Sequence, residues 1–273
     1  LTNTDISVVI GGLCSGETSA TAPIAEQNKK ILFSGCSSAP SISKAGDYIF
    51  RSYPSDALQG KFVADYVYNN LGKRKVAILA VSNEWGEGIR KTFSERFGEL
   101  GGVIVFDEQY AQESRDLKSE ITKIKQTDAE ALYFLGVTEA SLVGLRQAQE
   151  LDLSIPIIGG DTWDDSKIVE SPQAQGVLYT GAALVAPADW ESKLKSRKGN
   201  TTLCTPGAYN NVHIIADIMK RVGTDTTKIK DELYKTKNYP GVNGPVTLDK
   251  NGDLTDSKFV VKKIENGKAE VIK

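Results

Sequence analysis

Between residues 75 and 182 the sequence alternates regularly between short apolar runs and amphipathic stretches of helical length. The expected strands are Val76–Val81, Val103–Phe106, Ala131–Leu135, Ile155–Ile158 and Val177–Thr180. The expected helices between them are Gly88–Leu100, Asp116–Lys125, Glu139–Leu151 and Ser166–Glu170. Such an alternation is typical of βαβ units, whose strands pair in parallel. The chain is therefore expected to adopt an α/β fold built on parallel sheets.

A related pattern begins the chain, where two short strands each lead into a turn rich in serine, threonine and glycine. Ser7–Ile10 leads to Ser15, which is expected to be a helix N-cap, and Ile31–Ser34 leads to Cys36–Ser38. Parallel strands bring such turns to one sheet edge, where helix N-termini present free N–H groups. Each serine alone could be an ordinary capping residue. Two such turns in tandem favour a site for a small anion, such as a carboxylate or a phosphate.

In the second half of the chain, Gly159–Trp163 follows an expected buried strand. The acidic residue in this segment, Asp161, would lie at the ligand-binding edge of a parallel sheet. Two interpretations of Asp161 remain open: a ligand-binding carboxylate or a helix cap.

The overall composition narrows the classes of function. The chain has 273 residues, enough for one large or two smaller domains. It carries 33 Lys and Arg against 35 Asp and Glu, and this balance does not favour a nucleic acid or an anionic membrane as partner. No apolar run reaches the roughly 18 residues of a membrane span, and no signal peptide is recognisable. We therefore expect either a cytosolic protein or a mature, trimmed form of an exported one.

The cysteines and the single histidine argue against a metal site. Cys14, Cys36 and Cys204 are widely spaced, and only His213 is available beside them. His213 lies in an expected apolar helix, Tyr209–Val222, so we expect it to be packed in the core. The odd number of cysteines leaves one thiol free or paired with a group outside this chain. Neither a metal nor a cofactor is expected.

Motifs for nucleotide binding and catalysis are incomplete. Trp85–Gly88 follows a strand and opens a helix as a dinucleotide-binding loop does, but Lys91 occupies the position of the third glycine. There is no Gly-x-Ser-x-Gly motif, and no histidine is placed to activate Ser15 or Ser38. An enzyme acting on a phosphorylated or acyl substrate would lack a general base here. A protein that is not an enzyme is favoured.

The segment that begins at Asp249 matches a calcium-binding loop motif only in part. Asp249–Asp253 has the alternating acidic start of such a loop, yet Leu254 stands where glycine is needed and Val260 where the bidentate glutamate belongs. We expect a hairpin turn instead, between strands Val246–Leu248 and Lys258–Lys263.

Six segments together resemble the branched-chain amino-acid-binding proteins of bacterial ABC importers, the leucine/isoleucine/valine-binding family of type I periplasmic solute-binding proteins. They are VVIGGLCSGET (8–18), SGCSSAP (34–40), FRSYPSDALQG (50–60), WGEG (85–88), GGDTWDD (159–165) and NGPVTLDKNGD (243–253). Each segment is short, but their order and spacing are specific.

The resemblance implies two Rossmann-like lobes with parallel sheets, joined by hinge crossovers and closing on a ligand. The first lobe would comprise residues 1–56 and 183–256, and the second 57–182 and 257–273. Family members usually begin with two further βα units, so the first lobe is expected to be incomplete at its N-terminus. In the family, the cysteine at the position of Cys14 often pairs with one in that earlier segment, which implies that Cys14 lacks this partner here.

The ligand-binding residues that the resemblance implies are Ser15, Cys36, Ser37, Ser38, Trp85, Val137 and Asp161. Ser15 should bind the α-carboxylate of an amino acid, and Ser38 both the carboxylate and the ammonium group. Cys36 or Ser37 should contribute backbone groups. Asp161 should pair with the ammonium, and Trp85 should cover the ligand. Val137 replaces an aromatic residue of some relatives, which bears on the choice of ligand side chain.

The expected function is therefore a monomeric, non-enzymatic solute-binding protein that captures a small aliphatic amino acid and delivers it to an ABC permease. Its expected location is the periplasm of a bacterium or, for a lipid-anchored form, the cell surface. No nucleic-acid partner is expected. Two alternatives share the fold. One binds another carboxylate or amide, such as an aromatic acid or urea, in which case Asp161 would be idle, and the other is the ligand-sensing domain of a receptor.

Overall fold

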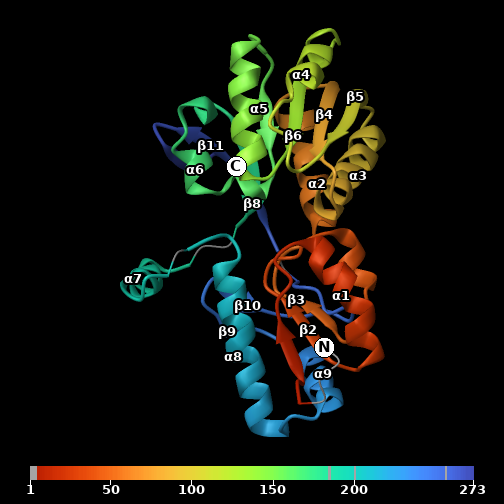
Figure 1. Cartoon of the computed structure of the whole chain (residues 1–273), viewed down its shortest axis with the longest axis vertical. Coiled ribbons are helices and arrows are strands. Elements are labelled where there is room, and N and C mark those ends of the chain that lie inside the picture. The colour runs from red at the N-terminus through yellow and green to blue at the C-terminus, as the bar shows by residue number, and fades with distance from the viewer. Residues whose placement is uncertain (1–4, 184–185, 200, 256) are drawn as a thin grey trace. The chain divides into compact units, whose positions relative to one another are not determined.

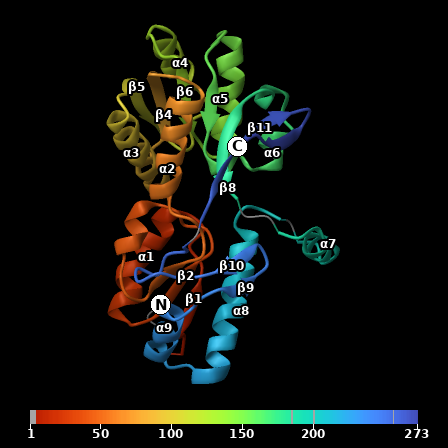
Figure 2. The same cartoon turned by 180° about the vertical axis from the view of Figure 1, so that it is seen from behind.

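The computed structural model describes residues 5–183, 186–199, 201–255 and 257–273, and the chain divides into two compact units (Figures 1 and 2). Unit 1 consists of Leu1–Ser55 and Ala183–Lys258, and unit 2 of Asp56–Ala182 and Phe259–Lys273. The chain therefore passes between the units after Ser55, Ala182 and Lys258. Each unit has its own hydrophobic core.

Unit 2 contains a seven-stranded sheet in the order β12-β11-β8-β7-β6-β4-β5. Its strands are β4 (Lys75–Val81), β5 (Val103–Tyr110), β6 (Ala131–Leu135), β7 (Ile157–Gly159), β8 (Leu178–Ala182), β11 (Phe259–Glu265) and β12 (Lys268–Val271). The five strands expected from the alternating pattern pair in parallel, whereas β11 and β12 add antiparallel pairs beside β8. The expected α/β fold with a mostly parallel sheet is confirmed.

Helices cover both faces of this sheet (Figures 1 and 2). They are α2 (Asp56–Asp65, continued by a π-helical turn, Tyr66–Asn70), α3 (Glu84–Glu99), α4 (Lys118–Lys125), α5 (Thr138–Glu150) and the short α6 (Ser166–Val169). Because central strands are covered twice, β6 is buried along its whole length and reads as an unbroken apolar run. The chain leaves β4 toward β5 on one side and returns to β6 on the other. The carboxyl ends of β4 and β6 thus flank the switch point at which open α/β sheets bind ligands.

Unit 1 contains a parallel three-stranded sheet, with β1 (Val8–Ile10), β2 (Ile31–Ser34) and β3 (Ile49–Arg51) in sequence order. Around it lie α1 (Ser15–Gln27), the 3-10 helix η1 (Pro40–Lys44), α8 (Thr205–Val222), α9 (Thr226–Tyr234) and the antiparallel pair β9 (Tyr239–Gly241) and β10 (Gly244–Val246). The helix α7 (Ala188–Ser196) also belongs to unit 1, but it has no buried residue and projects away from the sheet (Figure 1). Alternate side chains of β2 serve opposite faces. Ile31 and Phe33 join the core formed with α8 and α9, while Leu32 joins the core formed with α1 and η1.

Two sequence expectations about local structure are wrong. Helix α3 begins at Glu84, because the side chain of Asn83 accepts the Gly86 N–H at 2.8 Å and caps the helix there. Trp85–Gly88 is therefore the first helical turn and not a loop. The turn at Asp249 does form, but it joins no hairpin between the two expected strands: β10 pairs with β9, and β11 pairs with β8 in unit 2.

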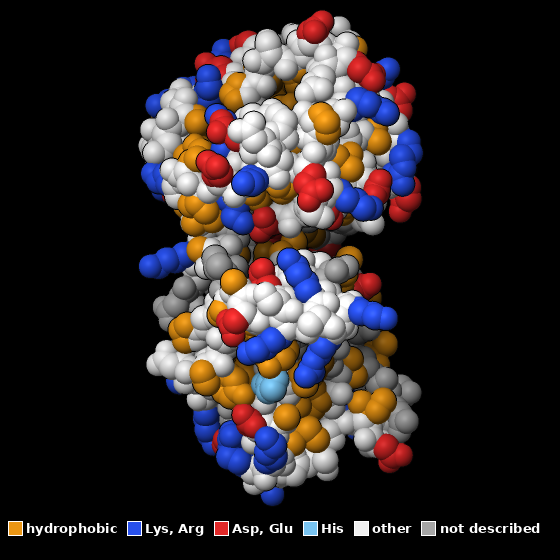
Figure 3. All heavy atoms as spheres, turned by 90° about the vertical axis from the view of Figure 1, so that its left-hand side faces the viewer, with side chains coloured by type: hydrophobic (Ala, Val, Ile, Leu, Met, Phe, Trp, Pro, Cys, Tyr) orange, Lys and Arg blue, Asp and Glu red, His pale blue; other side chains and the backbone are white. Residues whose placement is uncertain are grey.

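The expectation for His213 is also wrong. It lies on the exposed side of α8, and Figure 3 shows its pale blue side chain at the surface. The buried stripe of α8 contains Ile214, Ile215 and Ile218 instead. His213 stacks near Tyr209, with 4.4 Å between the ring centres. His213 therefore lies on the solvent-exposed face of α8, although the helix is largely apolar.

Candidate functional site

The two serine-rich turns of unit 1 meet, as the sequence predicts. Ser15 is the first residue of α1 and Cys14 is the N-cap, so the expected cap position was one residue too late. The Ser15 hydroxyl accepts hydrogen bonds from the N–H groups of Ser38 (3.3 Å) and Ala39 (3.1 Å). Because its oxygen is the acceptor in both, the Ser15 hydroxyl hydrogen is available for a further acceptor. The Ser38 hydroxyl makes no hydrogen bond within the described part of the chain, so both groups could serve a carboxylate.

A network of buried hydroxyls fixes the backbone beneath these serines. Ser37 Oγ lies 2.7 Å from Thr18 Oγ1 and donates to the Gly12 carbonyl at 3.1 Å. Ser34 Oγ also donates to the Gly12 carbonyl, and it accepts the Ser37 N–H at 2.9 Å. Gly12 has φ +77°, and a Cβ there would lie 1.9 Å from Thr18 Oγ1. Ser37 therefore uses its side chain for structure, and Ser34 Oγ accepts the N–H groups of both Ser37 and Cys36, the latter at 3.2 Å.

Arg51 supports the same turn, and the sequence analysis missed it. This fully buried guanidinium binds Asp253 through Nε at 2.7 Å and Nη2 at 3.0 Å. It also donates to the Ala39 carbonyl at 2.9 Å and to Ser43 Oγ at 2.8 Å. An arginine within an otherwise apolar strand was the available signal. Asp253, which the sequence placed in a turn, is its partner.

Cys36 forms a disulfide with Cys204, with 5.0 Å between their Cα atoms. Cys14 has a free thiol. Partial desolvation, followed by the charge of Glu17, raises the pKa of the Cys14 thiol, which makes it a poor nucleophile at neutral pH. The sequence had left the pairing open, because spacing does not determine which cysteines meet.

In unit 2 the three predicted residues lie at the carboxyl ends of adjacent strands. Trp85 is in the first turn of α3 after β4, Val137 is the N-cap of α5 after β6, and Asp161 begins a 3-10 turn after β7. The indole of Trp85 packs over Gly160, where a Cβ would lie 3.1 Å from the ring. Trp85 therefore lies next to the segment that carries Asp161, at the topological switch of the sheet.

Asp161 is held in a rigid, buried turn. It is 3% exposed. Thr162 donates to the Gly136 carbonyl at 2.7 Å, and the indole N–H of Trp163 donates to Ser141 Oγ at 2.9 Å. These two bonds fix the turn that carries Asp161, and a buried carboxylate at such a place suits recognition of a cationic group.

Tyr133 and Asp56 add to this acidic region. Burial, reinforced by the charges of Asp56 and Asp161, raises the pKa of Tyr133 well above its usual value, so its phenol stays protonated. Within the described residues the Tyr133 hydroxyl has no hydrogen-bond partner. Asp56 is fully buried in the first turn of α2. The negative charges of unit 2 favour a cation such as an ammonium group.

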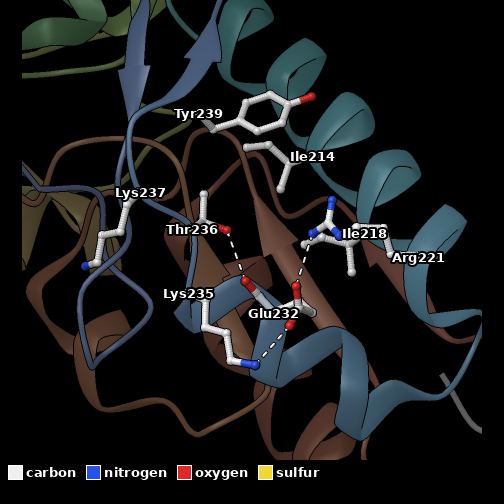
Figure 4. Close-up of a pocket in the computed structure, with 8 residues that line it drawn as sticks. All are labelled: Ile214, Ile218, Arg221, Glu232, Lys235, Thr236, Lys237 and Tyr239. Carbon is white, nitrogen blue, oxygen red and sulfur yellow. Dashed lines mark hydrogen bonds and ion pairs between the residues drawn. The ribbon is translucent and has the colours of Figure 1, made fainter.

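A groove elsewhere in unit 1 does not show similar chemistry (Figure 4). Glu232 accepts from Arg221 at 3.2 Å and from Lys235 at 2.9 Å, and Lys237 donates to the Leu248 carbonyl at 2.9 Å, so the charged groups of this groove are engaged within the protein. Among the described residues, no cluster of three or more His, Cys, Asp or Glu side chains could hold a metal ion. No helix in the described ranges is long and apolar enough to cross a membrane.

Comparison with known proteins identifies the family of the chain. Residues 1–269 match the family model described as periplasmic binding protein. The Leu/Ile/Val-binding protein homolog 3 of Brucella melitensis is 25% identical over 272 residues, covering 96% of this chain and 74% of that protein.

Solved structures show the same fold. The leucine-binding protein LivK of Thermotoga maritima has a TM-score of 0.91 at 24% identity, covering 100% of this chain and 80% of that one. The substrate-binding protein LivJ of Streptococcus pneumoniae, solved with isoleucine, has a TM-score of 0.84 at 25% identity, covering 99% of this chain and 80% of that one.

Proposed function

The chain belongs to the periplasmic binding protein family, and from this premise we propose that it is a solute-binding protein for a small aliphatic amino acid. Leucine, isoleucine and valine are the first candidates, because relatives and structural neighbours carry these ligands in their names or crystals. The proposed location is extracytoplasmic, in the periplasm or anchored at the cell surface. From there the protein, acting as a monomer, delivers its ligand to an ABC permease.

The observation that carries this proposal is the opposite chemistry of the two predicted residue sets. The set in unit 1 has the Ser15 hydroxyl, in the first turn of α1, and the Ser38 hydroxyl in the facing turn, and both can donate to a carboxylate. The set in unit 2 has the buried Asp161, which suits an ammonium. A free α-amino acid carries both groups on the same carbon atom.

In the proposed mechanism Ser15 and Ser38 bind the carboxylate, with backbone groups of Cys36 and Ser37 beside them. Asp161 binds the ammonium. Trp85 and Val137 contact the aliphatic side chain, since both follow strands at the same edge of the unit 2 sheet. Units 1 and 2 are proposed to be lobes that close on the ligand. Because the ligand binds the closed state better than the open one, it increases the population of the closed state.

Calorimetric titration with leucine and two analogues tests the proposal. One analogue, leucinamide, lacks the carboxylate, and the other, 4-methylpentanoate, lacks the ammonium. Leucine should bind far more tightly than either. Asp161→Asn should weaken leucine binding by more than about tenfold, the order expected when a buried ion pair loses one partner.

The matched control is Asp152→Asn, which changes an exposed aspartate of unit 2 and should leave affinity unchanged. Equal affinity of wild-type and Asp161→Asn protein for leucine would remove Asp161 from the site. Preference for benzoate or 4-methylpentanoate over leucine would instead assign a carboxylate ligand without an ammonium group.

A further inference from the structure

The turn that carries Ser37 and Ser38 is held on a second side, by the N-terminus of α8. Its Cys36 is bonded to Cys204, the N-cap residue of α8. Immediately before it, Gly35 packs against the first turn of α8 so closely that a Cβ would lie 2.5 Å from the Ala208 nitrogen. The turn therefore lies between α1, which it contacts through Ser15, and α8, to which it is covalently linked.

Other contacts between this turn's neighbours and α8 are weaker. Ser52 Oγ donates to the Gly207 carbonyl at 3.4 Å, and Asn211 donates to the Phe33 carbonyl at 3.3 Å. In the chain before α8, the described residues from 187 to 203 include no buried side chain. Cys204 is buried at the N-cap of α8, and the segment before it also contacts this helix through Trp190, whose ring centre lies 5.4 Å from that of Tyr209. The disulfide is therefore the strongest tie between α8 and the turn.

We propose that Cys204 is a positioning residue for ligand binding: its disulfide to Cys36 fixes the Ser37–Ser38 turn in the geometry that receives the ligand carboxylate. This inference rests on the proposed function. A turn that is ordered in advance binds more tightly, because the ligand does not have to supply the free energy of ordering. Reduction of the disulfide is then expected to weaken binding through the carboxylate.

Reduction is chemically accessible, because Cys36 is only partly buried. The thiolate of a dithiol reductant attacks one sulfur and breaks the S–S bond. The second thiolate of the reductant then attacks the mixed disulfide, forms the S–S bond of the cyclic reductant and frees the second protein thiolate; each protein thiolate takes up a proton from solvent. Two electrons pass to the protein, Cys36 and Cys204 become thiols, and the reductant becomes a cyclic disulfide.

The experiment uses the 273-residue chain carrying Cys14→Ser, in which Cys36 and Cys204 are the remaining cysteines. Oxidised protein, protein reduced with dithiothreitol, and the Cys204→Ser variant are titrated with leucine and with leucinamide. We expect leucine to bind about tenfold more weakly after reduction, with leucinamide changed less than about twofold. A purely structural loss would weaken both ligands alike, and equal losses would overturn the proposal.

Hydrogen exchange without ligand gives an independent measurement. Amides of residues 35–39 should exchange faster on reduction, while the core strand β2 keeps its protection. Unchanged exchange at 35–39 would overturn the proposal, and so would unfolding of all of unit 1. A Cys36→Ala/Cys204→Val variant, which keeps an apolar side chain at the buried position, should behave as the reduced protein does. Failure of oxidised protein to bind leucine would refute the proposed function, while the exchange rates would still decide the role of the disulfide.

Discussion

The buried pair of Arg51 and Asp253 offers the most direct test of how the unit 1 turn is supported. Arg51→Met removes the guanidinium but keeps an unbranched apolar side chain. The change leaves the Asp253 carboxylate, whose side chain is 15% exposed, without its cation, and the Ala39 carbonyl without its donor.

The expected cost follows from what is left behind. Removing one partner of a buried ion pair costs about 3 to 5 kcal/mol, because the remaining charge stays desolvated. The double variant Arg51→Met/Asp253→Leu removes both charges and should recover much of this loss. The matched control is Lys193→Met, since Lys193 and Asp189 pair at 3.3 Å with side chains 76% and 72% exposed. Such exposed pairs contribute about 0 to 1 kcal/mol.

Hydrogen exchange by mass spectrometry in increasing urea is the suitable assay, because peptides report on unit 1 and unit 2 separately. Arg51→Met should lower the unfolding free energy of unit 1 and leave unit 2 unchanged. A loss below about 1 kcal/mol, similar to that of Lys193→Met, would refute the reasoning from the buried pair. A double variant no more stable than the single one would show that the carboxylate is not what makes the single change costly.

Three further changes have outcomes that can be measured by urea unfolding. Cys204→Ser should lower the unfolding free energy by about 4 to 5 kcal/mol, because the disulfide closes a loop with a sequence separation of 168; a loss near zero would contradict this. Gly12→Ala should cost about 2 kcal/mol or more, since φ is +77° and the new Cβ would meet Thr18, whereas Gly16→Ala, with open space in a helix, should gain about 0.5 to 1 kcal/mol. The pKa of the Tyr133 phenol is raised in the folded state, whereas in the unfolded state the phenol ionises near pH 10. The unfolding free energy is therefore unaffected by this group below pH 10 and falls by about 1.4 kcal/mol per pH unit above it. Tyr133→Phe should lose less stability than wild type between pH 9 and 11, and equal losses would contradict the assignment.

The strands and helices of unit 2 could be predicted because local sequence carries their signal. Ala131–Leu135 has the same bounds in the prediction and in the structure, since a strand covered on both faces must be apolar throughout. The start of α3 was misplaced because the glycines of Trp85–Gly88 suggested a loop, while the capping role of Asn83 was overlooked. The burial of His213 was predicted wrongly because helical periodicity indicates that a helix has an apolar face, but not which residues lie at the boundary of that face.

The predicted site residues depended on topology as well as on local sequence. The contact between the two serine-rich turns could be predicted, because parallel strands bring their carboxyl ends to one edge. Arg51 was missed because nothing near it in the sequence reveals its partner, Asp253, about 200 residues away. Tyr133 was missed because an aromatic residue in a buried strand is more often a core residue than a polar group at a site.

The sequence by itself determined the α/β class, the parallel pairing of the five strands from β4 to β8 and the two turns that present Ser15 and Ser38, because these follow from the local alternation of strands, turns and helices along the chain. The tertiary structure alone decided which distant residues meet: Cys36 with Cys204, Arg51 with Asp253, and β11 with β8 instead of with its neighbour across the Asp249 turn. These pairings join positions far apart in the chain. Their choice depends on the packing of whole units around their cores, and no local pattern of residues records it.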